Sequence, residues 1–406
     1  MLDEENVPTQ EAAIAQDKEL RERVRAFLAE HPPAQTPRED FLTARFDAGL
    51  GYVHYPQGHG GLGLPRGLQP ALEEELAKGN APDIDARLNP IGLGMAAPTL
   101  IACASQEQKA RWLRPLWTGA HVWCQLFSEP GAGSDLASLA TRAVRDGDDW
   151  VITGQKVWTS LAHHATWGLL LARTDPDAPK HAGLTYFALD MHAPGVEVRP
   201  LRQLTGEAEF NEVFLSQVRV PDADRIGAVG DGWKVANATL MNERVAIGSS
   251  RAVAREEATI GFAAAAWRQH PERRTQELHQ RLLRLWAQAE VSRLAAERLR
   301  QQLAAGGPGP EGSAGKLIFA LLNQEISGWE VEFAGAEGLR YDDWSVRRDS
   351  SSDYGRGAVF RYLRSRGNSI EGGTSEILRN TIAERILGLP PEHRVDKDIA
   401  FKDLDK

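Results

Sequence analysis

Cysteine is scarce in this chain, with only Cys103 and Cys124 among 406 residues. The two lack the close spacing of a metal-binding pair, and one pair cannot form a disulfide framework for a chain of this length. Scarce cysteine is typical of proteins from a reducing compartment. We therefore predict a cytoplasmic protein without a metal site.

Excess positive charge and long apolar runs are also missing. The formal net charge is −9, so we expect no concentrated basic surface of the kind that binds nucleic acid, although a few local arginines could still hold a small anionic ligand. No run approaches the ~18 apolar residues of a membrane helix. The first residues, MLDEENVPTQ, are acidic rather than basic, which argues against a signal peptide. These absences exclude nucleic-acid binding and membrane spanning from the expected functions.

The composition that is present is that of a globular protein. Hydrophobic residues make up 42% of the chain and charged residues 25%, which argues against general disorder. A chain of 406 residues exceeds what one hydrophobic core usually organises. We therefore expect two or three domains.

The apolar pattern changes twice along the chain. Residues at helical spacing in 11–30, 68–76 and 91–116 predict a helical first region. Short segments rich in β-branched and aromatic residues follow, such as DDWVITGQKVWTS and NEVFLSQVRVP, and turn formers separate them. They predict an antiparallel β domain of roughly 110 residues. Helical patterning returns from Trp233 onward.

One of the predicted strands contains an irregularity. In VFLSQVRV the apolar alternation slips at Ser216 and Gln217. A slip of this kind indicates a β-bulge, in which one strand carries an extra residue.

The segment WCQLFSEPGAGSD is the sharpest short motif. Pro130 stiffens its turn, while Gly131 and Gly133 let backbone amides approach a ligand without an intervening Cβ. Ser128 and Ser134 add hydroxyls beside those amides. The loop suits a polar or phosphorylated cofactor; alone, it is also compatible with a plain glycine-rich connection.

A second motif, GQKVWTS, lies about 25 residues downstream on a predicted strand. Trp158 could lay its indole against a flat ring, and Thr159 or Ser160 could hydrogen-bond a ring nitrogen. Taken alone, a tryptophan in the core of the β domain explains the motif as well.

A third motif, SIEGGTSEILRN, places two glycines before a helix. Thr374 or Ser375 can cap that helix, which leaves free amides at its positive end for a polarised oxygen. A capped helix start without a ligand remains the simpler reading of this motif alone.

Together and in this order, the three motifs resemble the acyl-CoA dehydrogenase family, over about residues 20–391. The resemblance implies an α+β multidomain fold with an N-terminal helical domain (1–120), a middle antiparallel β domain (121–228) and a C-terminal helical bundle (229–406). It also implies FAD as the cofactor, an acyl-CoA substrate and a homodimer or homotetramer. Electrons would pass to an electron-transfer flavoprotein.

The resemblance assigns the FAD contacts by position. Trp158 would cover the dimethylbenzene side of the flavin, and Ser160 would reach N5, which receives the hydride. Ser134 would also face the entrance to the acyl site. The implied cofactor-binding residues are Gln125, Phe127, Ser128, Gly133, Ser134, Trp158, Ser160, Thr374 and Glu376.

The catalytic base is the main open assignment. Removal of the α proton of a thioester needs a positioned carboxylate and a donor to the carbonyl oxygen. Many family members carry the carboxylate immediately before the last Gly-Thr, where this chain has Gly372. Other members place it before an arginine on a C-terminal helix, which corresponds to Glu243 and Arg244 here. We predict Glu243 as the base, Glu371 as its rival and the Gly372 amide as the donor to the thioester, with Arg244 as a supporting residue on the substrate side.

Two departures from the family affect the expected assembly. A Gln…Gly-Gly-x-Gly stretch that touches a neighbouring subunit's FAD reads VEFAGAEGL here, with Glu332 and Ala336 at altered positions. A carboxylate beside pyrophosphate would repel it. The Arg-x-x-Phe-Gly segment has no clear equivalent. One subunit of a heteromeric dehydrogenase is therefore an alternative, as are an acyl-CoA oxidase, a flavin monooxygenase and a non-catalytic protein on the same fold.

Overall fold

The computed structural model describes residues 10–248, 255–305, 310–341, 344–346, 356–394 and 396–404, without the side chains of 10–13, 243–248 and 303–305. The contacts group the chain into two compact units. One contains Met1–Leu93 and Ala104–Val122, and the other contains Gly94–Cys103 and Trp123–Lys406. The domain boundaries drawn from the sequence remain a prediction.

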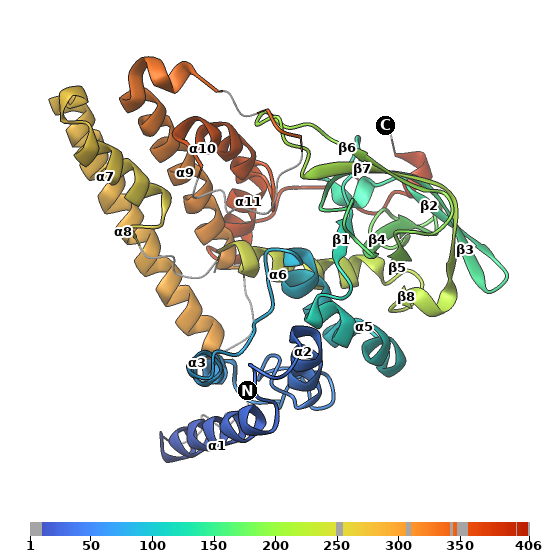
Figure 1. The fold of residues 1–406 in the computed structure, drawn as a ribbon. Helices are drawn as coiled ribbons and strands as arrows, with labels where there is room; N and C mark the ends of the chain where they lie inside the picture. Colours follow the sequence, from blue (N-terminus) through green and yellow to red (C-terminus); the bar gives the residue numbers. More distant parts are fainter. Residues whose placement is uncertain are drawn as a thin grey trace. The chain divides into compact units, whose positions relative to one another are not determined.

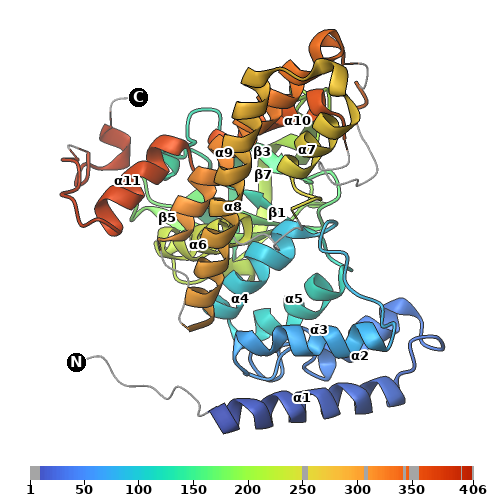
Figure 2. The same ribbon diagram turned by 90° about the vertical axis from the view of Figure 1, so that its left-hand side faces the viewer.

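The first unit is helical, as predicted. Its helices are α1 (Gln10–Glu30), α2 (Arg38–Asp47), η1 (Arg66–Leu68), α3 (Gln69–Lys78) and α5 (Gln106–Thr118). The buried carboxylate of Glu75 on α3 pairs with Arg21 and Arg25 on α1, which ties these two helices together (Figure 2). A capping box at Ser105 starts α5, and Gly119 ends it in a left-handed conformation.

The second unit contains a mostly antiparallel sheet with the order β6-β7-β3-β2-β4-β5-β8, and β1 pairs with β4 in parallel. The middle β domain is thereby confirmed. The strands are β1 (Trp123–Leu126), β2 (Arg142–Asp146), β3 (Asp149–Ser160), β4 (Trp167–Arg173), β5 (Leu184–Asp190), β6 (Val196–Pro200), β7 (Phe210–Pro221) and β8 (Arg225–Ile226), with the short helices η3 (Leu136–Ser138) and η4 (Asp222–Asp224) between them.

Two bulges interrupt the pairing of β3 with β7. At the first, Ser216 and Gln217 of β7 lie opposite the single residue Thr153, and Gln217 has a φ of 54°. The bulge expected from the slipped alternation is therefore confirmed. At the second, the extra residue is on β3 at Val157 and Trp158, and Trp158 has a φ of 62°. A bulge bends its strand and re-aims a side chain, so the second one decides where Trp158 points.

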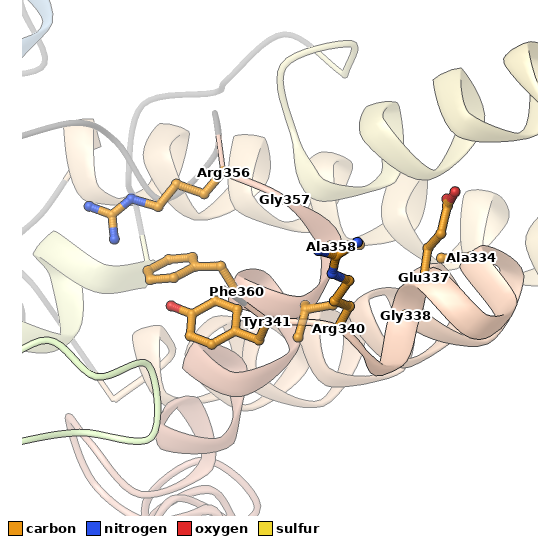
Figure 3. A pocket seen from close by; sticks show the side chains of 10 residues that line it. Ala334, Glu337, Gly338, Arg340, Tyr341, Arg356, Gly357, Ala358 and Phe360 are labelled. Carbon is orange, nitrogen blue, oxygen red and sulfur yellow. The ribbon is translucent and has the colours of Figure 1, made fainter. Parts of the chain in front are cut away.

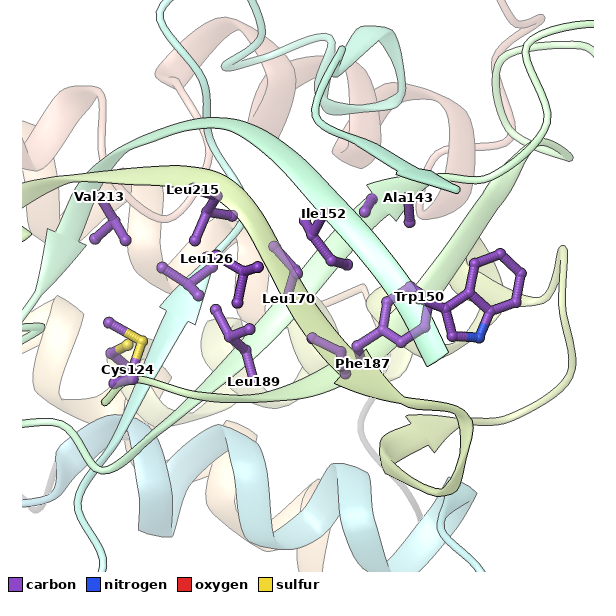
Figure 4. Close-up of a cluster of buried hydrophobic side chains, with 14 of the residues drawn as sticks. Cys124, Leu126, Ala143, Trp150, Ile152, Leu170, Phe187, Leu189, Val213 and Leu215 are labelled. Carbon is purple, nitrogen blue, oxygen red and sulfur yellow. The ribbon is translucent and has the colours of Figure 1, made fainter. Parts of the chain in front are cut away.

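The core of the β domain is a cluster of buried apolar side chains, most of them carried by the strands (Figure 4). On β4 its members are the alternating residues Leu170 and Ala172. The whole of β4 is buried, so this strand is covered on both faces. Members that Figure 4 labels include Cys124, Leu126, Trp150, Ile152, Leu170, Phe187, Leu189, Val213 and Leu215.

Helices form the rest of the second unit, which confirms the C-terminal helical bundle (Figure 1). The long α9 contacts α6, α7, α8, α10 and α11. None of the helices in the described ranges combines the length and hydropathy that a membrane crossing needs. Their bounds are α4 (Ala97–Cys103), α6 (Gly232–Gly248), α7 (Thr259–Gln269), η5 (Pro271–Arg273), α8 (Gln276–Ala305), α9 (Gly312–Ala334), η6 (Gly335–Leu339), α10 (Ala358–Ser365), η8 (Arg366–Ser369), α11 (Ser375–Arg385) and η9 (Phe401–Asp403).

Candidate functional site

A glycine-rich loop follows β1 and forms the centre of the candidate site. The backbone amides of Glu129 and Ala132 each donate to the carbonyl of the other, at 3.0 and 3.1 Å, which closes a tight turn over Pro130 and Gly131. No described atom lies within 4 Å of a Cβ built at Gly131 or Gly133. The packing of the chain therefore does not require these glycines, and the open space in front of them fits a ligand that approaches the backbone.

A buried ion pair joins this loop to β3. The ammonium of Lys156 is fully buried and donates to Glu129 Oε1 at 2.8 Å, to the Phe127 carbonyl at 3.0 Å and to the Leu171 carbonyl at 2.9 Å. Burial favours a raised pKa for Glu129. The Lys156 ammonium and hydrogen bonds from residues 140 and 141 outweigh burial and hold the pKa of Glu129 below its usual value. The carboxylate is therefore charged and locks the loop in place.

A second set of contacts holds the far end of the loop. Lys180 Nζ donates to both carboxylate oxygens of Asp135, at 3.0 and 2.8 Å, and Ser138 Oγ donates to Asp135 at 2.5 Å. The buried guanidinium of Arg173 donates to the carbonyls of Ala137 at 2.6 Å and Leu139 at 3.1 Å. The loop is thus fixed at both ends while its middle stays exposed.

Trp158 lies beside the loop with its indole 58% exposed. A left-handed backbone is costly for a bulky residue and marks a site where the surroundings impose it. The indole lies near the ring of Phe210, with the ring centroids 5.9 Å apart at a nearly perpendicular angle. A core tryptophan would be buried, so the alternative that Trp158 is a core residue is wrong.

The structure brings the first two motifs together. The amide of Val157 donates to the carbonyl of Ser128 at 2.9 Å, so Ser128 lies next to the Trp158 bulge. Ser160 is half-buried, and Thr159 Oγ1 is buried without a hydrogen-bond partner in the described part of the chain. A buried hydroxyl without a partner is uncommon in proteins and is compatible with a missing ligand or water.

The remaining predicted cofactor-binding residues on and just after β1 differ in exposure. Gln125 is half-buried on β1. Phe127 is buried, and its ring packs edge-on against Tyr186 at 5.8 Å. Phe127 therefore serves the core of the β domain at least as much as any ligand.

The third motif forms a left-handed loop before α11. Gly372 and Gly373 have φ angles of 61° and 96°, and the buried Lys316 on α9 donates to the Gly373 carbonyl at 2.7 Å. Thr374 Oγ1 accepts the Ile377 amide at 3.2 Å, which confirms Thr374 as the N-cap. Glu376 is exposed and pairs with Arg379 at 3.4 Å.

Glu371, the rival base, is fully engaged in the structure. Its two carboxylate oxygens accept from Arg364 at 3.2 and 3.1 Å, and Asn368 donates to it at 2.7 Å. The guanidinium of Arg364 lies 5.9 Å from the ring centroid of Phe210, the neighbour of Trp158. The third motif is therefore connected to the second through Phe210.

Glu243 and Arg244 belong to α6, but their side chains lie outside the part of the chain that the structure describes. One turn earlier on α6, the buried Thr239 exchanges hydrogen bonds with Tyr186 at 2.9 Å and with Thr99 of α4 at 3.0 Å. Tyr186 in turn contacts Phe127. The backbone of α6 is thus anchored to β5, whose Tyr186 contacts Phe127 at the start of the glycine-rich loop.

The end of α9 carries the departures from the family. Glu332 pairs with Arg281 at 2.6 Å, and Glu337 pairs with Arg273 at 3.0 Å. A pocket of about 470 Å³ opens here, with Tyr341, Phe360 and Arg356 at one end and Glu337 at the other (Figure 3).

The sequence reasoning missed the charged residues that hold the loop, which are Glu129, Lys156, Arg173 and Lys180. A signal was available for two of them. Lys156 sits within an alternating strand pattern on the same face as Ile152, and Arg173 ends the apolar run WGLLLAR. A cation in a buried strand position needs a partner, and an acidic loop residue is the natural candidate.

Three acyl-CoA dehydrogenase family models match the chain. The N-terminal domain model matches residues 15–120, the middle domain model 124–218 and the C-terminal domain model 230–387.

Individual proteins agree with the family models. The chain is 42% identical over 385 residues to the acyl-CoA dehydrogenase FadE34 of Mycobacterium tuberculosis, matching 93% of this chain but only 50% of that protein's length. It is 40% identical to the acyl-CoA dehydrogenase IpdE1 of the same organism, over 85% of this chain and 86% of that protein. A solved structure titled "Tcur3481-Tcur3483 steroid ACAD" is 27% identical, with a TM-score of 0.69 over 93% of this chain and 98% of that one. The chain belongs to the acyl-CoA dehydrogenase family, a family of oxidoreductases.

Proposed function

We propose that the chain catalyses the FAD-dependent α,β-dehydrogenation of an acyl-CoA thioester to the trans-2-enoyl-CoA, with Glu243 as the base. One observation carries the proposal. The buried Glu129–Lys156 pair locks the glycine-rich loop beside an exposed, left-handed Trp158, and such an arrangement has no evident role within the fold alone.

The residues present fit FAD. The open space at Gly131 and Gly133, the exposed indole of Trp158 and the unpartnered Thr159 hydroxyl suit a flat ring carrying a phosphorylated tail. When bound, FAD supplies the two-electron acceptor that removal of two hydrogens requires. The residues that would hold it are Gln125, Phe127, Ser128, Gly133, Ser134, Trp158, Ser160, Thr374 and Glu376.

The base and the carbonyl donor are assigned to different elements. A general base needs a free carboxylate within reach of the proton. Glu371 is held by Arg364 and Asn368, which favours Glu243. The Gly372 amide lies in a loop fixed by Lys316 and Thr374 and would donate to the thioester oxygen as negative charge develops there. Ser134 and Arg244 would contact the substrate.

The altered end of α9 favours a heteromeric assembly over a homo-oligomer. Glu332, which pairs with Arg281, stands where the family has a glutamine in its neighbour-facing stretch, and a carboxylate beside a pyrophosphate is repelled. The similar solved dehydrogenase Tcur3481-Tcur3483 joins two components, which supports a second kind of subunit. Because that protein is a steroid dehydrogenase, we also propose a ring-bearing acyl group as the substrate. Both remain proposals, as do the electron-transfer flavoprotein as acceptor and a cytoplasmic location.

The test is anaerobic titration of the purified chain, alone and co-expressed with a neighbouring dehydrogenase gene. We expect a yellow protein whose absorbance near 450 nm, a wavelength typical of roughly any oxidised flavin, bleaches with a thioester from a panel of straight-chain, branched and steroid acyl-CoAs. A colourless protein under both conditions would contradict the proposal. Rapid reduction of oxygen after bleaching would instead identify an oxidase.

A further inference from the structure

The last described residues of the chain return to the β domain. In 396–404, Ala400 forms a β-bridge with Pro179, and the amides of Phe401 and Lys402 donate to the carbonyls of Ala178 and Pro176, each at 3.0 Å. This segment therefore contacts the β domain of its own chain. It packs on the loop between β4 and β5 of its own chain.

The first route from this segment to the glycine-rich loop runs through Arg173. The guanidinium carbon of Arg173 lies 3.5 Å from the ring centroid of Phe401, and both residues are buried. The same guanidinium donates to the carbonyls of Ala137 and Leu139 in and after η3, and to Lys180. A cation on an aromatic face is stabilised when it is desolvated, so the Phe401 ring fixes the group that holds η3.

The second route runs through Lys180, whose side chain is only 7% exposed. Its ammonium lies 2.5 Å from Asp396 and 2.8 Å from Asp135, the last residue of the glycine-rich motif. Asp135 also accepts from Ser138. Lys180 therefore bridges the C-terminal segment and the loop.

The two ends of the loop depend on different parts of the chain. Its beginning is held by Glu129 and Lys156, which form their hydrogen bonds with the β domain in the described part of the chain. Its end is held by Arg173 and Lys180, which both contact residues 396–404. We propose that residues 396–404 position the end of the glycine-rich loop for its cofactor, with Phe401 and Asp396 acting through Arg173 and Lys180.

The cofactor role of residues 396–404 rests on the proposed FAD site. Whether these residues hold the end of the loop can be measured without FAD. The test variant is Phe401→Ala combined with Asp396→Asn in the full chain. The matched control is Lys402→Ala, because Lys402 lies in the same segment and its side chain pairs with the exposed Asp177. Phe401→Trp keeps an aromatic face and serves as the conservative rescue.

Hydrogen exchange followed by mass spectrometry is the first readout. The amides of Ser138 and Leu139 donate within η3 and are protected as long as η3 is held. We expect about tenfold faster exchange at these amides in the double variant. Exchange in β3 should stay unchanged, and Lys402→Ala and Phe401→Trp should match the wild type. Wild-type exchange at 136–139 in the double variant would overturn the proposal.

FAD affinity is the second readout. The double variant should bind FAD about tenfold more weakly, while kcat at saturating FAD stays within about twofold of the wild type. Faster exchange at η3 with unchanged FAD affinity would overturn the positioning role. A wild-type chain that binds no FAD would sink the proposed function, and the exchange experiment would still decide whether the segment holds the loop. If the double variant does not fold, Phe401→Leu is used in the same two measurements.

Discussion

The strand-borne and helix-borne halves of the candidate site are stabilised differently. In the β domain, the cation of Lys156 is fully buried, and its acidic partner Glu129 belongs to the same loop that would contact the cofactor. At the end of α9, Glu332 and Arg281 are about half exposed, at 51% and 39%. The first half buries its ion pair, whereas the ion pair of the second half lies at the surface.

This difference indicates what each half needs in order to work. The charges at the beginning of the glycine-rich loop are paired once the sheet folds, because Lys156 is on β3 and Glu129 is on the loop that follows β1. The site at the end of α9 faces outward. Its altered residues make contact with the FAD phosphates of an identical subunit unfavourable. The comparison is compatible with our proposal that a different subunit completes the helix-borne half.

The largest effect is expected from Lys156→Met. It leaves the buried carboxylate of Glu129 without its partner, which typically costs about 3–5 kcal/mol. Chemical denaturation of the purified variant measures the change in free energy of unfolding. Arg281→Met, which removes the exposed pair in the helix-borne half, is the control and should cost less than about 1 kcal/mol. If both variants lost the same free energy of unfolding, the two halves of the site would not be stabilised differently.

Acid should weaken the strand-borne half specifically. Because the pKa of folded Glu129 is held below that of the unfolded chain, its ionisation stabilises the fold above the unfolded value of about 4.3. That contribution is lost as the pH falls below this value through the depressed pKa. Denaturation at a series of pH values should show a larger acid-induced loss of stability in the wild type than in Glu129→Gln. If the stability of the two proteins changed with pH in parallel, the pKa of Glu129 would not be lowered in the folded chain.

Trp158→Ala should separate binding from folding. The indole is exposed, so we expect the free energy of unfolding to change by less than about 1 kcal/mol. Loss of an aromatic face against a flavin should weaken FAD binding by about tenfold. Flavin fluorescence titration measures the affinity, and Trp158→Phe should restore most of it. A large loss of stability with normal affinity would return Trp158 to a structural role.

The smallest effect is expected from Thr374→Ala in the helix-borne half. Removing an N-cap costs about 1 kcal/mol, and Thr374→Ser should cost little because serine also caps. Thermal unfolding of the two variants provides the comparison. An alanine variant as stable as the serine variant would show that the cap observed at Ile377 does not stabilise α11.

Local sequence signals predicted a good part of the fold. The slipped alternation at Ser216 and Gln217 predicted the β7 bulge, and the Gly-Gly-Thr-Ser order predicted the Thr374 cap, because both depend on neighbours along the chain. The changes of apolar pattern along the chain predicted the helical, β and helical regions. These features are set by residues within a few positions of one another.

The contacts between distant residues could not be predicted in this way. Lys156 meets Glu129 only because β1 and its loop fold against β3, and Phe401 meets Arg173 only after the chain has passed through all the helices. Nothing near Glu371 in the sequence singled out Arg364 as its partner. The spacing of motifs identified candidate site residues. It did not identify the charged residues that fix the position of the glycine-rich loop.

The assignment of the base at position 243, opposite a flavin held by the strand-borne half, is tested most directly by anaerobic titration of Glu243→Gln beside Glu371→Gln. The account predicts that both variants are yellow, that Glu243→Gln no longer bleaches near 450 nm, where roughly any oxidised flavin absorbs, and that Glu371→Gln still bleaches. Normal bleaching of Glu243→Gln together with its loss in Glu371→Gln would contradict it.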